Sequence, residues 1–356
     1  IGSNFNGAGT QIMDSEIDAT GNVTAVGYIV GGSNFNDTSL VNAFVPSLGY
    51  SGFVSRYSSN GSLQWYLPIN SVSTNHPWIQ TKVRQVALMS DGSSIISSVF
   101  KNPLTIGDVT LGNDTVVYQD TTASGITPST CSAFIARIDI NGNLMWLKQI
   151  NESHFGNFAE AITVKDDIIH VLLKTSNGFD DDGLTVYKFN DMGQLLDSFT
   201  MTATGFTHIK DIEVDDDGSV YFSVNFYYPF TIPNGPPPFG VNTSTDGAIV
   251  KLDSSLNYSS HVCFGDHPSS GSEGSYDIEI INNHLYALAF SNALIDINPN
   301  GSSVWFGGFS PQGDANIFLA KYTLNGLILV DYIAPSTPFT GDDGFMPESS
   351  IASFDD

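Results

Sequence analysis

Three clusters of aspartate are the residues in this sequence best suited to bind a metal ion. They are Asp180, Asp181 and Asp182, then Asp215, Asp216 and Asp217, and last Asp342 and Asp343, and a glycine follows each cluster. Carboxylate oxygens are the ligands that Ca²⁺ prefers, so calcium is the one cofactor that the clusters suggest. None has the D-x-D-x-D-G spacing of a calcium loop or a closing glutamate. We interpret the clusters as solvated turns, and the sequence predicts no cofactor and no metal site, with the first two clusters kept as calcium candidates.

His261, Cys263 and His267 are a second group with metal-binding side chains. Imidazole and thiolate are ligands of zinc and copper. His261 and Cys263 fall on one face of a predicted strand, but His267 falls in a loop, so we predict no metal site there. The other cysteine, Cys131, belongs to a different repeat, and a disulfide needs Cα atoms within about 7 Å. We therefore predict no disulfide.

Catalytic motifs are absent from the sequence. It contains no G-x-S-x-G elbow, no H-E-x-x-H helix, no phosphate loop and no S-x-D-x-G-x-x-W box of propeller sialidases. Glutamate is scarce, with 7 residues among 37 acids, which leaves few groups for tuned acid–base pairs. The prediction is that the protein is not an enzyme. The alternative, a glycosidase or lyase, requires two carboxylates that converge at about 5–10 Å.

Sequences that accept an N-linked glycan are frequent in the chain. The eight Asn-x-Ser/Thr sites begin at Asn22, Asn36, Asn60, Asn113, Asn151, Asn242, Asn257 and Asn300. Most lie in or beside predicted turns, where a glycan acceptor has to be accessible. Together with few charges and abundant Ser and Thr, they predict an extracellular or cell-surface glycoprotein.

The charge balance limits the partners. Acids outnumber bases by 37 to 12, a formal net charge of −25. Binding to nucleic acid or to an anionic membrane surface needs a basic surface, so both are excluded as partners. No run of 18 apolar residues exists, which argues against insertion into a membrane.

A repeat of ten residues organises the whole chain. It covers residues 56–65, 137–146, 188–197, 251–260 and 321–330, and each copy opens with a base: Arg56, Arg137, Lys188, Lys251 or Lys321. These five bases are a large share of the 12 in the chain. We interpret the column as structural, with each base pairing with an aspartate of its own or the next unit. The alternative is a basic rim that attracts an anion.

Each copy of the repeat reads as a β-hairpin with an upstream hairpin before it. Asn-Gly pairs such as Asn60-Gly61 and Asn141-Gly142 suit a tight turn between two alternating strands. Four-stranded units at nearly regular spacing are typical of a β-propeller. We therefore predict an all-β propeller of about five four-stranded antiparallel blades, at about 12–70, 82–151, 158–201, 208–264 and 275–333. Tandem β-sandwiches are the alternative fold.

The sequence also resembles a known family. Residues 26–32 with 52–65, and again residues 133–146, are similar to the SBBP-type β-propeller repeat. The likeness covers most of the chain and is clearest in the first two units. It implies a propeller fold and a secreted or surface location, and it implies no particular reaction.

Two segments suggest how the protein meets partners. Residues 352–356 match the first strand of a unit at 212–216, so we predict a propeller over 1–344 and an incomplete further unit over 345–356 that pairs within the chain or with a neighbouring copy. Residues 226–241 form an insert rich in aromatics and proline, a stiff apolar contact surface or a plug over the propeller mouth. The predicted contact residues are Phe226, Tyr227, Tyr228, Phe230, Phe239, Ala352 and Phe354.

These observations favour a structural or adhesive role. We predict a glycosylated extracellular propeller that assembles with copies of itself, as the subunit of a surface filament or sheath. The first alternative is a binding module for carbohydrate or for another surface protein. Clustered exposed Trp or Tyr on one face would favour that alternative.

Overall fold

The computed structural model describes residues 9–30, 50–71, 81–100, 104–106, 109–111, 132–150, 156–176, 182–203, 206–226, 230–235, 245–264, 273–291, 294–306 and 316–334. These residues form strands and turns and contain no helix, which confirms the all-β prediction. Accordingly, no helix in the described ranges is long and apolar enough to cross a membrane.

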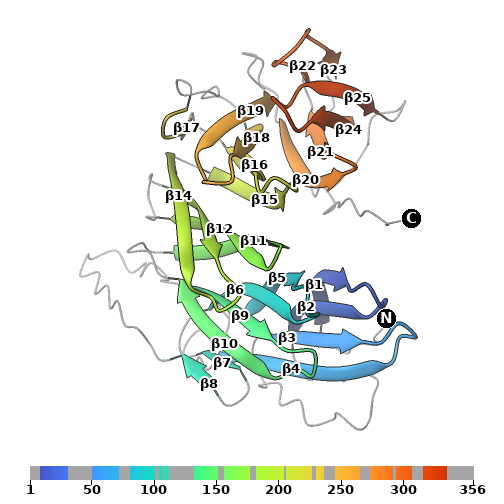
Figure 1. Ribbon diagram of the computed structural model, residues 1–356, viewed down its shortest axis with the longest axis vertical. Coiled ribbons are helices and arrows are strands. Elements are labelled where there is room, and N and C mark those ends of the chain that lie inside the picture. Colours follow the sequence, from blue (N-terminus) through green and yellow to red (C-terminus); the bar gives the residue numbers. More distant parts are fainter. Residues whose placement is uncertain are drawn as a thin grey trace, which may run out of the picture. The chain divides into compact units, whose positions relative to one another are not determined.

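Five of the sheets in the described ranges each contain four antiparallel strands in meander order (Figure 1). Sheet A has β1 (Gly9–Ile17), β2 (Val23–Val30), β3 (Tyr50–Tyr57) and β4 (Leu63–Ser71), and sheet B has β5 (Lys82–Leu88), β6 (Ser94–Phe100), β9 (Ser132–Ile138) and β10 (Leu144–Ile150). Sheet C has β11 (Gly156–Lys165), β12 (Ile168–Ser176), β13 (Asp182–Phe189) and β14 (Leu195–Ala203). Sheet D has β15 (Phe206–Val214), β16 (Val220–Phe226), β18 (Asp246–Leu252) and β19 (Tyr258–Phe264), and sheet E has β20 (Glu273–Ile281), β21 (His284–Ser291), β24 (Asn316–Thr323) and β25 (Leu329–Ile333).

Short strands extend two of these sheets at their outer edges. β7 (Leu104–Ile106) pairs with β4, and β8 (Val109–Leu111) pairs with β7. β17 (Phe230–Thr231) pairs in the same way with β14. A separate small hairpin joins β22 (Ile295–Asp296) to β23 (Trp305–Phe306).

The chain divides into two compact units. Unit 1 comprises Ile1–Gly178 and Lys188–Leu195, and unit 2 comprises Phe179–Tyr187 and Leu196–Asp356. Sheets A and B belong to unit 1 and sheets D and E to unit 2, while sheet C contributes strands to both.

Neighbouring sheets within a unit pack face to face in a repeated order. In unit 1, β5 packs against β1, β2 and β3, and β11 packs against β5, β6 and β9. In unit 2, β20 packs against β15, β16 and β18. The first strands of sheets B, C and E therefore lie against the preceding sheet. Because both faces of sheet B are then covered, β6 is buried at every position instead of alternating between buried and exposed. β16 of sheet D is also buried at every position.

The hairpin turns follow from the repeated sequence. Gly61, Gly142, Gly193 and Gly326 all have a positive φ, between 71° and 85°, which glycine adopts without steric cost. The fourth copy has Leu256 at the same position, and it too has a positive φ, of 55°. Its side chain is 3% exposed, so burial compensates for the conformation of a residue that rarely adopts it.

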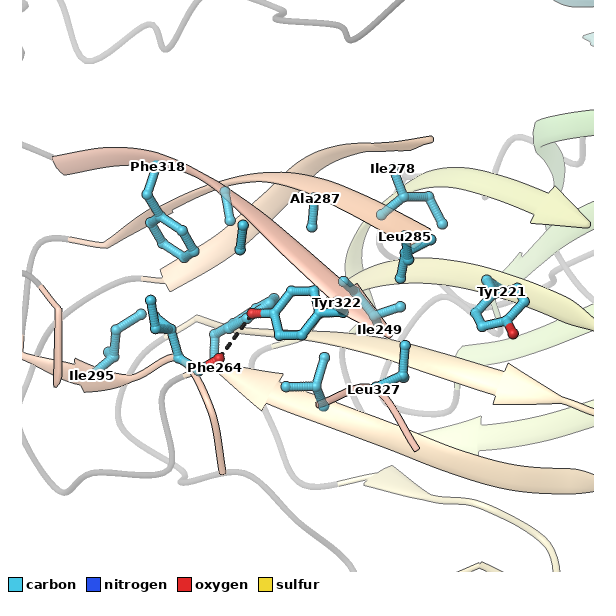
Figure 2. Close-up of a cluster of buried hydrophobic side chains, with 14 of the residues drawn as sticks. Tyr221, Ile249, Phe264, Ile278, Leu285, Ala287, Ile295, Phe318, Tyr322 and Leu327 are labelled. Carbon is cyan, nitrogen blue, oxygen red and sulfur yellow. Dashed lines mark hydrogen bonds between the residues drawn. The ribbon is translucent and has the colours of Figure 1, made fainter. Parts of the chain in front are cut away.

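The core of unit 2 shows how two sheets and the small hairpin share one apolar interior (Figure 2). Phe264 of β19 lies against Phe318 and Tyr322 of β24, with ring centroids 5.9 and 6.4 Å apart. Tyr322 is completely buried, and its hydroxyl donates a hydrogen bond of 2.9 Å to the Ile297 carbonyl. This bond satisfies the polar end of an otherwise apolar contact.

Candidate functional site

A groove of about 970 Å³ lies in unit 1 between the turn ends of sheets A and B. The β1–β2 turn, the β5–β6 turn and the β9–β10 turn supply its walls, with side chains of β3 and β4 between them. Ile17 and Ile140 on these turns are 60% and 50% exposed, and Trp65 of β4 is half-buried. Gln64 and Asn141 add exposed amide groups. The groove therefore combines apolar surfaces with neutral hydrogen-bonding groups.

Arg56 and Asp18 form a buried ion pair in this groove. The other guanidinium nitrogen of Arg56 donates to the Gly92 carbonyl in sheet B at 3.2 Å and to the Thr24 hydroxyl at 3.3 Å. Arg56 thus links its own sheet to the next one. Because its donors are used in this way, the groove does not present a free cation to an anionic ligand.

The carboxylate of Asp18 is held in its ionised form. Burial acts to raise its pKa, but hydrogen bonds from Thr20 and Asn22 outweigh burial and keep the pKa well below the usual value. The backbone N–H groups of Thr20 and Asn22 lie 2.9 Å from the same carboxylate oxygen. Asp18 therefore stabilises the turn and is poorly suited to be a general acid.

Trp65 closes the same junction between sheets. Its indole N–H donates to the Ile140 carbonyl at 2.8 Å. Its ring lies directly over Gly142, where a Cβ atom would come within 2.9 Å of the ring. The glycine is needed there both for its φ of +85° and for the close approach of the indole.

The next junction, from sheet B to the β13–β14 turn, repeats these contacts. Arg137 pairs with Asp91 at 2.8 Å and donates to the Asp191 carbonyl at 2.8 Å, and Trp146 donates to that carbonyl at 2.9 Å. Trp146 also lies over Gly193, as Trp65 lies over Gly142. Burial acts to raise the pKa of Asp91, but hydrogen bonds from Ser93 and the charge of Arg137 lower it.

Unit 2 carries a variant of this junction between sheets D and E. Lys251 donates to the Leu324 carbonyl at 2.9 Å, and the buried Tyr221 hydroxyl lies 3.2 Å from the same oxygen. The ammonium of Lys251 also lies over the Tyr221 ring. Among the other bases of the column, Lys321 lies over the Tyr286 ring. Burial and the charge of nearby Lys188 lower the pKa of His170.

The first strand of each sheet A to E has a β-bulge at an equivalent position, a feature the sequence analysis missed. The bulged residues are Met13, Arg84, Glu160, Lys210 and Tyr276. Two pairs of them interact between neighbouring sheets: Arg84 with Glu160 at 2.6 Å, and Lys210 with the Tyr276 ring at 5.9 Å. In these two pairs the bulges bring side chains of adjoining sheets together.

An aspartate after the bulge binds the backbone of the next sheet. Asp14 accepts the Val86 N–H at 2.8 Å, and Asp211 accepts the Ile278 N–H at 3.3 Å. Val86 and Ile278 lie two residues after the bulge of their own strands. The sequence contains a signal for this contact, since Asp14, Asp211 and Asp277 each stand two residues before a glutamate, in first strands.

Asp211 of β15 and Asp277 of β20 form a carboxyl pair. Burial, the nearby Glu213 carboxylate and the hydrogen bond with Asp277 raise the pKa of Asp211 well above its usual value. One proton shared between the two groups relieves their repulsion. A directly hydrogen-bonded pair does not have the separation of about 5 Å or more that glycosidases need between their carboxylates.

The calcium candidates are turn residues where the structure describes them. The carboxylate of Asp215 accepts the N–H groups of Asp217 and Ser219 at 3.0 and 2.8 Å and the Tyr221 hydroxyl at 2.9 Å. Asp139 and Asp253 bind their own turns in the same way. Asp180, Asp181 and the Asp182 side chain lie outside the described part. The described part contains no group of three His, Cys, Asp or Glu residues that could hold a metal ion.

Two further expectations concern His261 and the cysteines. The His261 ring lies 2.8 Å from the Tyr258 hydroxyl, and Cys263 is buried in β19. Cys131 and His267 are outside the described ranges, so the proposed absence of a disulfide with Cys131 stays a prediction.

The predicted contact residues are in part unavailable to a partner. Phe226 is 1% exposed within β16, so its inclusion in an exposed contact surface is wrong. The insert begins inside a sheet because Phe226 continues the apolar second strand. Phe230 belongs to β17, which pairs with β14. Tyr227, Tyr228, Phe239, Ala352 and Phe354 lie outside the described residues.

Four of the eight glycan acceptor sites lie in described turns. Asn60 and Asn257 are exposed, and Asn22 is half-buried with its amide bound to Asp18. Asn300 is exposed, but its amide nitrogen donates to the carbonyls of His261 at 2.6 Å and Gly326 at 3.1 Å. Asn36, Asn113, Asn151 and Asn242 are outside the described residues.

No protein-family model matches the chain, and no curated protein sequence matches it.

Proposed function

We propose that the protein is an extracellular, glycosylated structural or adhesive module of the β-propeller type, with sheets A to E as its blades. The observation that carries the proposal is the repeated junction between sheets. Arg56, Arg137 and Lys251 each donate a hydrogen bond to a backbone carbonyl in a turn of the next sheet. Such contacts make the packing of neighbouring sheets rigid, which is what a structural module requires.

Three features support the propeller within this proposal. The sheets contain four-stranded meanders, the first strands of sheets B, C and E lie against the preceding sheet, and the bulge recurs at one position. Stacked blades around an axis have these properties, and the resemblance of residues 133–146 to the SBBP-type repeat points the same way. Tandem sandwiches would pair sheets two by two and would not repeat one junction along the chain.

Self-assembly is the second part of the proposal. Residues 352–356 have the sequence of a first strand, like that of residues 212–216. A segment of this kind can add to the edge of a sheet in a neighbouring copy through its backbone groups. The partners that we propose are therefore copies of the same chain.

Electron microscopy of the native material, with intact mass measured on the same sample, tests the proposal. Ordered filaments or sheets, together with a mass above 38.2 kDa per chain, are expected for a glycosylated structural subunit. Monodisperse single particles at high concentration, with the unmodified mass, would remove both the assembly and the glycoprotein parts.

Carbohydrate binding in the groove of unit 1 is the second candidate function. Exposed Ile17 and Ile140 beside Trp65 offer apolar surface to a sugar ring, and Gln64 and Asn141 offer amides to its hydroxyls. We expect at least one member of a panel of soluble oligosaccharides to bind the wild type. The variants Gln64→Ala and Asn141→Ala should each bind that oligosaccharide at least tenfold more weakly. Asn325→Ala, at the same position of the last repeat, is the matched control. Equal binding by all variants would reject the groove.

A further inference from the structure

Two carboxyl groups meet where sheets D and E pack together. Asp211 of β15 and Asp277 of β20 occupy the same position in their sheets, directly after the bulge, and their side chains are hydrogen-bonded to each other. The Asp211 carboxylate also accepts the N–H groups of Ile212 at 2.8 Å and Ile278 at 3.3 Å. The negative charge of nearby Glu213 acts on the same group. Both aspartates are half-buried, so water screens the repulsion between these acids only in part.

The equivalent contact between sheets A and B uses a single aspartate. Asp14 accepts the Val86 N–H from sheet B, just as the aspartate of β15 accepts an N–H from sheet E. The residue after the bulge of β5 is Gln85, where β20 has Asp277. A neutral residue therefore suffices at this position for the backbone contact between two sheets. The second carboxylate of the D–E contact is not explained by that backbone contact.

A buried hydroxyl lies beside the two carboxyl groups. Ser223 of β16 is the cross-strand partner of Asp211, so the two side chains lie next to each other on one face of sheet D. Tyr221 and Asn225 are on the same face of β16, and both hydrogen-bond to sheet E. Ser223 is 0% exposed, yet its hydroxyl has no hydrogen-bond partner among the described residues. A buried hydroxyl without a partner is costly, which indicates that a further group belongs beside it.

We propose that sheets D and E bind a calcium ion between them, through the carboxylates of Asp211 and Asp277 and the hydroxyl of Ser223. These ligands are all oxygens and two of them are charged, which suits a hard divalent cation. Calcium takes about six to eight oxygen ligands, and water completes the set from the solvent side of the half-buried aspartates. The ion neutralises both carboxylates, whereas the proton that they share in its absence neutralises only one. It would join β15 and β20 as a structural ion.

Calorimetric titration of the full-length chain with calcium chloride, after metal ions have been removed with EDTA and dialysis, tests the site. Asp277→Gln gives sheet E the residue that Gln85 provides in sheet B, and it should bind calcium about tenfold or more weakly than the wild type. Asp14→Asn is the matched control, because it removes a carboxylate at the equivalent position of sheet A. This control should bind calcium like the wild type. Equal calcium affinity of the wild type and Asp277→Gln, or no saturable binding, would overturn the proposal.

Thermal unfolding with and without calcium distinguishes a ligand from a packing residue. Calcium should raise the Tm of the wild type, because an ion that binds only the folded chain stabilises it. Ser223→Ala removes a hydroxyl without a partner, so without calcium its Tm should equal or exceed that of the wild type. With calcium its Tm should rise by at most about half of the wild-type increase. An equal increase in both proteins would overturn the proposed site. Neither measurement requires assembly or glycans, so failure here is distinguishable from failure of the proposed function.

Discussion

Asn60 and Asn300 both begin a glycan acceptor sequence, yet their side chains serve different purposes. The Asn60 oxygen accepts hydrogen bonds from the Ser58 hydroxyl and the Ser62 N–H, and no acceptor for its amide nitrogen occurs among the described residues. The Asn300 nitrogen joins the β22–β23 turn to His261 and Gly326. A glycan on Asn300 would disrupt these bonds, whereas a glycan on Asn60 would extend into solvent.

Expression in a host that attaches N-linked glycans should therefore show a glycan on Asn60 and none on Asn300. Asn60→Gln is expected to lower the intact mass by one glycan. Asn300→Gln should leave the mass unchanged and lower the free energy of unfolding by about 1 kcal/mol through the lost hydrogen bonds. A loss of one glycan from Asn300→Gln would contradict this assignment.

The raised pKa of Asp211 leads to a second prediction, which concerns the pH dependence of the free energy of unfolding. Its pKa is raised in the folded protein by burial and by its acidic neighbours. The folded state therefore holds a proton that the unfolded state has released, and stability falls as pH rises from the unfolded pKa of about 4 through the raised folded value. Asp211→Asn keeps an oxygen for the Ile278 N–H but does not ionise. It should show a smaller loss of stability as the pH rises above about 4.

Urea denaturation at several pH values measures this effect. Asp211→Ala removes the acceptor as well as the charge, so it should be less stable than Asp211→Asn at every pH. A wild type and an Asp211→Asn variant with parallel pH profiles would show that the carboxyl pair with Asp277 does not share a proton.

The contact of Trp65 with Gly142 in the turn of the next sheet can be tested by substitution. Gly61 and Gly142 have nearly the same φ, +83° and +85°, but Gly61 has no atom within 4 Å of an added Cβ, whereas Gly142 has Trp65 at 2.9 Å. Alanine at either position costs about 1 kcal/mol for the left-handed backbone. Gly142→Ala should cost about 1–2 kcal/mol more, because it displaces the indole.

Equilibrium unfolding of the two variants gives the difference directly. In a Trp65→Ala background the extra cost of Gly142→Ala should disappear, so that the two glycine substitutions become equal. If Gly142→Ala and Gly61→Ala are equal in the wild-type background, the indole contact does not stabilise the junction.

The hairpins were predictable from the sequence because their signals are local. The column at Arg56 and Arg137 and the turn glycines Gly61 and Gly142 lie within ten residues of each other in each copy, and the strands follow from their spacing. The fourth copy was less certain because Leu256 replaces the glycine, and its burial in the folded protein is not visible in the repeat itself.

The functional groups were less predictable because they act between sheets. Trp65 meets a carbonyl 75 residues away, and no pattern within one repeat reveals the distance. The bulge and the Asp14–Val86 contact were missed for the same reason. The aspartate clusters suggested calcium, whereas the Asp215 carboxylate accepts hydrogen bonds from the backbone of its own turn. One sequence cannot distinguish these uses of a carboxylate.

The net charge of −25 affects how whole molecules of the protein interact with one another. Copies with this charge repel one another, so the proposed self-assembly has to overcome electrostatic repulsion. Salt shortens the range of this repulsion from about 30 Å at 0.01 M to about 3 Å at 1 M. Light scattering should therefore show more assembly as the sodium chloride concentration rises across this range. Assembly that weakens with salt would instead indicate attraction between opposite charges at the interface.

The aromatic side chains at these junctions bind carbonyls that lie later in the chain, and this has a consequence for synthesis. Trp65, Trp146 and Tyr221 reach partners that lie 75, 45 and 103 residues later. A ribosome adds about 5–20 residues each second, so each of these side chains waits for several seconds before its partner leaves the exit tunnel. A nascent chain would therefore mature one junction at a time, and its newest sheet would always be the one open to chaperones or to a wrong partner.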